Sequence, residues 1–105
     1  MPLLAKRRVG RIGSRDRRRS VKSLIARDGC SCSYCQKPLI FRFMEPDSIP
    51  VEPVRYGNLD HRIPEARGGS NRLENLLLAC ERCNNEKGGL TEEEFRRAKD
   101  DRQEG

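Results

Sequence analysis

Apolar residues are sparse along this chain, and their spacing changes from one segment to the next. Over residues 14 to 28, Val21, Leu24 and Ile25 recur at near-helical spacing among charged residues. Gly29 follows at a position suited to a helix stop. This segment is therefore predicted to form a short basic helix.

Two strands are predicted farther along the chain. The run LLLAC at 76 to 80 is continuously apolar and short, which favours a strand. An earlier strand is expected at about 54 to 59, and the loop between the two is marked by Pro64 and the pair Gly68 and Gly69. Joined by this loop, the two strands would form a hairpin.

The remaining segments show turn and helix signals. Residues 44 to 53 contain three prolines, which predicts an irregular excursion. A helix is predicted to begin near Cys83 and to break at Gly88. Thr91, with Glu94 three residues later, matches a capping box and predicts a last, polar helix.

Composition limits the size of the core. The chain has 105 residues, of which 34% are hydrophobic and only five are aromatic, so we expect one domain whose small core needs a staple. Five cysteines, two-residue spacers and no apolar amino-terminal signal segment favour metal ligation in a reducing, cytoplasmic compartment over disulfides. No apolar run approaches the roughly twenty residues that a membrane-spanning helix needs.

Positive charge is concentrated at the amino-terminal end. Residues 1–27 carry ten Lys or Arg against one Asp, which gives +9, and the other 78 residues contribute −3 to the total of +6. We therefore divide the chain into a basic arm with its helix, residues 1–28, and a nearly neutral body, residues 29–105. A basic arm of this kind suggests a polyanion partner. The alternative is a disordered, solubilising tail.

Four of the five cysteines have the spacing of a zinc site. Cys32 and Cys35 are separated by two residues, as are Cys80 and Cys83. Two such pairs can complete a tetrahedral shell of four thiolates around one structural Zn²⁺. Closing that shell would supply order that the small core lacks. Cys30 is left over, as a spare ligand or, in the favoured interpretation, as a buried or free thiol.

Asp60, His61 and Asn84 form a candidate catalytic set. Phosphodiester cleavage needs a Lewis acid and a base that takes a proton from water. A carboxylate such as Asp60 is a hard oxygen donor suited to Mg²⁺, and an imidazole such as His61 can act as the base. Asn84 follows Cys83 and is the candidate second ligand. Taken singly, His61 also fits an ordinary loop residue and Asn84 a helix-start residue.

The segment between 58 and 89 resembles the HNH endonuclease family. The resemblance rests on LDHRIP, then GGSNRLENLLLAC, then ERCNNEKGG, with 14 positions from His61 to Asn75 and 9 from Asn75 to Asn84. It implies an α+β fold, a small ββα-metal (treble-clef-like) domain of the subtype with four zinc-binding cysteines. It further implies that His61 is the general base, that Asp60 and Asn84 hold the catalytic divalent ion, and that Asn75 pins the loop that aims His61.

The resemblance implies a metal-dependent endonuclease that hydrolyses DNA phosphodiester bonds. The third motif position is Asn rather than His, which favours hard ions such as Mg²⁺ or Mn²⁺, with other divalent ions left open. In this family the helix typically enters the DNA minor groove, and no module for reading bases is evident in the sequence. We therefore expect duplex DNA to be bound with little sequence specificity.

Several cations are candidates for contacts with the nucleic acid backbone, against the alternative that they are solvated surface residues. They are Arg62, Arg67, Arg72 and Lys87 around the motif, and Arg17, Arg18 and Arg19 in the basic helix.

Two other functions compete with this interpretation. A noncatalytic treble-clef zinc module that binds nucleic acid or protein would explain the cysteines and the basic arm but not the coincidence of Asp60, His61 and Asn84. A cysteine hydrolase that uses Cys30 with His61 lacks an orienting partner. Among nucleases, phage packaging, restriction and mobile-element roles stay open, as does the oligomeric state, because one active site cuts one strand.

Overall fold

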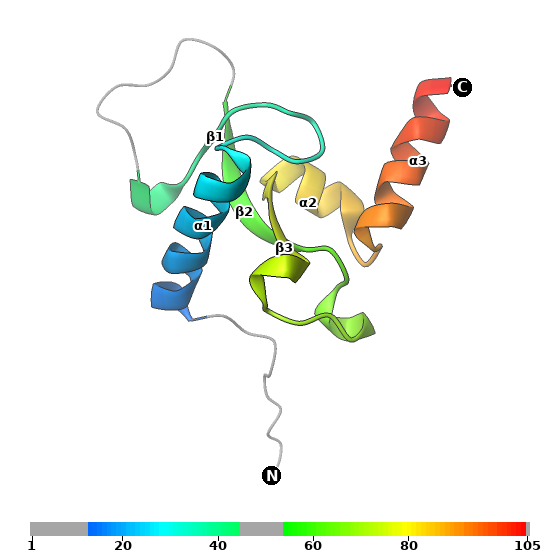
Figure 1. Ribbon diagram of the computed structural model, residues 1–105. Helices are drawn as coiled ribbons and strands as arrows, with labels where there is room; N and C mark the ends of the chain where they lie inside the picture. Colours follow the sequence, from blue (N-terminus) through cyan, green and yellow to red (C-terminus); the bar gives the residue numbers. More distant parts are fainter. Residues whose placement is uncertain (1–12, 45–53, 105) are drawn as a thin grey trace.

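The computed structural model describes residues 13–44 and 54–104 (Figure 1). The amino-terminal arm before residue 13 and nearly all of the excursion expected at 44 to 53 lie outside the described residues. Within them the main elements are, in order, α1 (Ser14–Asp28), β1 (Leu39–Ile40), β2 (Arg55–His61), β3 (Leu76–Cys80), α2 (Glu81–Lys87) and α3 (Glu92–Glu104). Three single-turn 3₁₀ helices are also present, η2 (Arg42–Met44), η3 (Glu65–Arg67) and η4 (Leu73–Asn75).

The three strands form one sheet in the order β1-β2-β3. The predicted hairpin is confirmed: β2 and β3 pair antiparallel from Gly57 opposite Cys80 to His61 opposite Leu76. β2 runs two residues beyond the predicted end at residue 59, because Asp60 and His61 pair with the first residues of the apolar run. The hairpin thus places Asp60 and His61 at the last two positions of β2.

The basic helix α1 has the predicted bounds and packs beside β3 (Figure 1). Val21 and Leu24 are fully buried in the same apolar cluster as the strands, so α1 belongs to the same core. All five residues of β3 are buried, which explains its continuous apolar sequence. Gly29 ends the helix at φ +90°, and its N–H donates to Ile25 O at 2.8 Å.

Both later helices start with a side-chain cap. α2 begins two residues before the predicted Cys83, because the Sγ of Cys80 accepts the backbone N–H of Cys83 at 3.3 Å and caps the helix. The capping box of α3 is confirmed: Thr91 Oγ1 accepts the N–H of Glu94 at 3.1 Å, and a carboxylate oxygen of Glu94 accepts the N–H of Thr91 at 3.0 Å. β2, β3 and α2 therefore form a compact ββα unit, with α1 and α3 on either side (Figure 1).

Among residues 13–44 and 54–104, no helix is both long enough and apolar enough to cross a bilayer.

Candidate active site and metal centre

The four paired cysteines converge at one point of the fold. The Sγ atoms of Cys32, Cys35, Cys80 and Cys83 all lie within 4.8 Å of one another, and those of Cys35 and Cys80 are 3.8 Å apart. A tetrahedral site with Zn–S bonds of about 2.3 Å places its sulfurs roughly 3.8 Å apart. The two knuckles therefore fit a four-thiolate metal centre of the size that zinc requires.

Backbone N–H groups also point at these sulfurs. The N–H groups of Tyr34 and Cys35 both donate to Cys32 Sγ at 3.4 Å. Burial raises the pKa of the Cys32 thiol, but these two donors, together with the backbone of Cys80 and the thiol of Cys35, outweigh it and lower that pKa to about 7. The pKa of the Cys83 thiol is raised, chiefly by burial and then by the neighbouring sulfurs. Crowded thiols of this kind favour loss of protons to a bound cation.

Cys30 lies outside the four-sulfur group. Its thiol donates to the backbone oxygen of Leu39 at 3.3 Å, and burial raises its pKa. Cys30 is therefore a partly buried thiol rather than part of the cluster, as the favoured interpretation of the sequence had it.

Asp60 lies at the junction of β2, α2 and the first cysteine knuckle. Its side chain is 4% exposed. One carboxylate oxygen, Oδ1, accepts from the amide of Asn84 at 2.9 Å, and the other, Oδ2, accepts from the hydroxyl of Tyr34 at 2.6 Å. The structure thus brings together Asp60 and Asn84, which are 24 positions apart in the sequence.

Lys87 takes a position that the sequence did not predict. The expectation of a surface lysine able to contact nucleic acid is wrong for this structure, because Lys87 is only 3% exposed. Its ammonium group donates to the backbone oxygen of His61 at 2.9 Å and lies 3.4 Å from Asp60 Oδ1. One turn of α2 after Asn84, Lys87 turns inward and neutralises the buried carboxylate.

His61 follows Asp60 but contacts the loop between β2 and β3. Its Nε2 lies 2.7 Å from the side-chain oxygen of Asn71 and 3.9 Å from a carboxylate oxygen of Glu65. The side chain is 19% exposed, so solvent can reach it. Adjacent strand residues point to opposite sides, which separates His61 from the contacts of Asp60. Asn71 was missed by the sequence interpretation, because nothing in its spacing marks it as a partner of His61.

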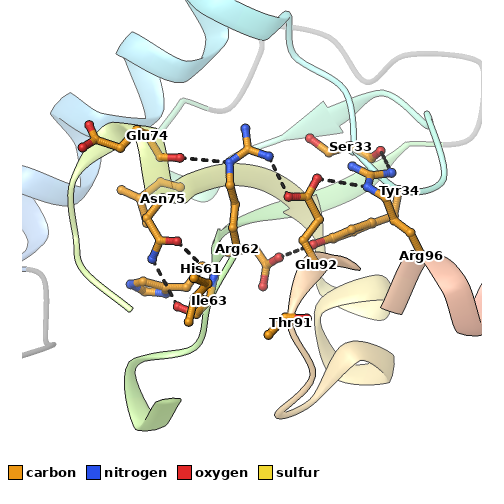
Figure 2. Close-up of polar contacts among 12 residues, drawn as sticks. Ser33, Tyr34, His61, Arg62, Ile63, Glu74, Asn75, Thr91, Glu92 and Arg96 are labelled. Carbon is orange, nitrogen blue, oxygen red and sulfur yellow. Dashed lines mark hydrogen bonds and ion pairs between the residues drawn. The ribbon is translucent and has the colours of Figure 1, made fainter. Parts of the chain in front are cut away.

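Asn75 closes the base of that loop (Figure 2). Its Oδ1 accepts the N–H of Ile63 at 3.0 Å, and its Nδ2 donates to Ile63 O at 3.1 Å and to Ser70 O at 2.7 Å. Gly69 makes this approach possible, since a Cβ built there would lie 1.6 Å from Ile63 O. The loop that carries Asn71 is therefore fixed to the residue two positions after His61.

Replacing Asn75 with alanine is expected to lower the free energy of unfolding by about 1–3 kcal/mol. The substitution removes three hydrogen bonds and leaves the backbone groups of Ile63 and Ser70 without these partners. Urea denaturation followed by circular dichroism measures this change. Asn85→Ala, at an exposed position of α2, is the matched control and should change stability far less. Equal effects of the two substitutions would show that Asn75 does not hold the loop.

Two of the candidate DNA-contacting arginines pair with α3, and Figure 2 shows the pairing of Arg62. Arg62 donates to the carboxylate of Glu92 at 2.7 Å and to the backbone oxygen of Glu74 at 3.0 Å. Arg67 donates to Glu94 at 2.6 Å and, with the capping contacts, lowers the pKa of that carboxyl to about 2. Both guanidinium groups thus tie the loop to the carboxy-terminal helix, while Arg72 is exposed.

The three arginines of α1 differ in surroundings. Arg17 donates to the side-chain oxygen of Asn58 on β2. Arg18 lies over the ring of Phe43, 5.4 Å from its centroid, and Arg19 is exposed beside Asp16. Arg18 and Arg19 also line one hollow of the surface, together with Arg15 and Lys22.

A hairpin followed by a short helix, with a four-cysteine centre at its base, defines a small ββα-metal domain. Residues 32–89, which are 58 of the 105 residues, match the sequence model of the family described as HNH endonuclease. The chain therefore belongs to the HNH endonuclease family.

A similar relative is the CRISPR-associated endonuclease Cas9 of Corynebacterium diphtheriae. The two are 35% identical over 65 residues, which cover 61% of this chain and 5% of that protein. The chain thus spans about 5% of the length of this curated relative. No solved structure gives a significant match.

Proposed function

We propose that this chain is a metal-dependent endonuclease that hydrolyses DNA phosphodiester bonds, with His61 as the general base and a divalent ion held by Asp60 and Asn84. The observation that carries the proposal is the 2.9 Å contact between Asp60 Oδ1 and the amide of Asn84. His61 directly follows Asp60 in the sequence, and the chain belongs to a nuclease family.

The donor atoms suit a hard cation. A carboxylate and a carboxamide offer oxygen ligands of the kind that Mg²⁺ and Mn²⁺ prefer. A half-turn of the Asn84 amide exchanges its nitrogen for its oxygen, so the side chain can turn from donating to Asp60 to binding a cation beside it. The ammonium of Lys87, 3.4 Å from Asp60 Oδ1, balances the same carboxylate charge that a divalent ion would bind, so the two cations compete for it. When bound, a divalent ion supplies Lewis acidity to the scissile phosphate and its leaving oxygen.

The contact of His61 indicates which of its nitrogens acts as the base. With the side-chain oxygen of Asn71 as the acceptor, the 2.7 Å hydrogen bond places the proton of the proposed base on Nε2. In a neutral ring this leaves the lone pair on Nδ1 to take a proton from water. Asn71 then acts as the residue that selects the tautomer, and Asn75 holds the loop from which Asn71 acts.

Duplex DNA is the proposed substrate, bound through phosphates with little sequence specificity. The exposed Arg72 and the hollow on α1 lined by Arg18 and Arg19 supply positive charge for backbone contacts. Zinc is the proposed occupant of the four-cysteine centre. A role within a larger phage or restriction assembly, in a bacterial or infected cytoplasm, is part of the proposal.

The test is nicking of a supercoiled plasmid by zinc-loaded protein in Mg²⁺ or Mn²⁺. Cleavage is expected only with added ion, and Asp60→Asn, which removes the charged ligand at constant size, should raise the ion concentration for half-maximal rate by about 10–100-fold. Asp16→Asn, on the exposed face of α1, is the matched control. Binding of the plasmid without cleavage in any divalent ion would instead support a noncatalytic zinc module.

A further inference from the structure

Tyr34 links the cysteine centre to the candidate ion site. It lies within the first knuckle, between Cys32 and Cys35, and its own N–H donates to Cys32 Sγ at 3.4 Å. Its hydroxyl, at the other end of the side chain, donates to Asp60 Oδ2 at 2.6 Å. The residue is 8% exposed, so water does not compete freely for either contact. Tyr34 therefore contacts a cysteine sulfur through its backbone and the carboxylate of Asp60 through its side chain.

The ring of Tyr34 is held in place by α3 (Figure 2). Phe95 packs edge-on against it with ring centroids 4.9 Å apart, and the guanidinium of Arg96 lies 4.7 Å from its centroid. Arg96 is itself fixed, because it donates to Ser33 O at 3.2 Å and to a carboxylate oxygen of Glu92 at 3.0 Å. The hydroxyl is thus presented to Asp60 from a packed ring with little freedom to move.

We propose that Tyr34 is a positioning residue for the divalent ion, an inference that rests on the proposed function. By occupying Oδ2, the phenol leaves Oδ1 as the carboxylate oxygen that faces Asn84. Asp60 then offers the ion a single oxygen in a fixed direction. The same contact couples the two metal centres, since movement of the cysteine knuckle moves the donor that orients Asp60.

The chemistry of the donor supports this role. A hydroxyl bonded to a carboxylate forms a short, charge-assisted hydrogen bond that fixes the plane of the carboxylate. Unlike the ammonium of Lys87, which lies 3.4 Å from Asp60 Oδ1, the phenol is neutral and adds no charge that opposes an incoming cation. Partners of this kind around metal ligands typically change metal affinity or activity by about 10–100-fold when removed.

A purely structural role for Tyr34 makes a different prediction. If the hydrogen bond from the hydroxyl to Asp60 only stabilised the fold, loss of the hydroxyl would change stability but leave ion affinity unchanged. Tyr34→Phe separates the two roles, because it removes the hydroxyl and keeps the ring that packs on Phe95 and Arg96. Tyr56→Phe is the matched control, since Tyr56 is the other tyrosine of the chain and stacks with Arg42 on the surface.

The first experiment is calorimetric titration of Mn²⁺ into the full, zinc-loaded chain without DNA. Tyr34→Phe is expected to bind Mn²⁺ about tenfold more weakly than the parent, with its zinc content unchanged, and Tyr56→Phe is expected to bind as the parent does. Parent-like affinity in Tyr34→Phe, while Asp60→Asn loses binding, would overturn this inference alone. Undiminished binding in Asp60→Asn would instead overturn the proposed ion site.

A second measurement covers the case in which Tyr34→Phe folds poorly. In the Tyr56→Phe background Tyr34 is the only tyrosine, so 3-fluorotyrosine labelling gives a single fluorine resonance. Titration with Mg²⁺ is expected to shift this resonance, with half-saturation equal to that of ion binding. A resonance that does not move when the ion binds would contradict a contact between the phenol and the ligand carboxylate.

Discussion

His61→Ala is expected to lower the rate of DNA cleavage by about 10²–10⁴-fold, the usual range for loss of a general base. The substitution removes the imidazole that would take the proton from water, but it leaves Asp60 and Asn84 in contact on the far side of β2. Binding of Mn²⁺ should therefore stay within a few-fold of the parent. Single-turnover rates on supercoiled plasmid at saturating Mg²⁺ measure the loss.

A substitution beside His61 tests whether the loss is specific to the imidazole. Glu65→Gln is a suitable control, because its carboxylate lies 3.9 Å from Nε2 and is the neighbouring acidic group on the loop. It should preserve most of the rate. A parent-like rate in His61→Ala would show that another group activates the water.

Asn71→Ala should reduce the rate less than His61→Ala does. The substitution leaves the ring in place but removes the side-chain oxygen, 2.7 Å from Nε2, that in the proposed function holds the proton on this nitrogen. Both tautomers then become accessible, so only part of the population presents Nδ1 as an acceptor.

The predictable parts of this fold are those written in short stretches of sequence. The apolar run of β3, the glycine after α1 and the capping box of Thr91 and Glu94 each predict structure from residues that are only a few positions apart. The two cysteine pairs also predict one shared four-sulfur site, although 44 residues separate Cys35 from Cys80. Metal-ligand spacing is a local pattern repeated, and it can be recognised before the fold is known.

The remaining contacts depend on tertiary packing, and no periodic pattern in the sequence predicts them. Lys87 reads as one more cation on a polar helix, yet the short α2 turns it toward Asp60, 27 positions earlier. The hydroxyl of Tyr34 meets the same carboxylate from a knuckle 26 positions away. Likewise, the sequence marks Arg62 only as a candidate DNA contact. Its partner Glu92 lies 30 positions farther along, so no local pattern predicts the ion pair. Each of these depends on the folded chain bringing distant segments together.

Removal of zinc is expected to abolish the cooperative unfolding transition of the chain. The four sulfurs join the knuckle before β1 to the end of β3 and the start of α2, so they fasten segments that the small apolar core holds weakly. Zinc binding by short zinc-finger peptides contributes about 10–16 kcal/mol near neutral pH, which is similar in size to the roughly 5–15 kcal/mol that typically separates folded from unfolded protein. Loss of the ion is therefore expected to remove most of the free energy of unfolding. Thermal melts followed by circular dichroism measure this loss.

Cys80→Ser should reproduce the effect of zinc removal, because Cys80 caps α2 and is a proposed zinc ligand. Cys30→Ser is the matched control, since its sulfur lies outside the four-sulfur group and only donates to Leu39 O. It should keep one zinc per chain by native mass spectrometry and melt close to the parent. Because Tyr34 would carry the state of the knuckle to Asp60, partial zinc loss should also weaken Mn²⁺ binding before the fold is lost. A zinc-free chain that melts cooperatively at the parent temperature would show that the apolar core suffices and that the cysteines serve another purpose.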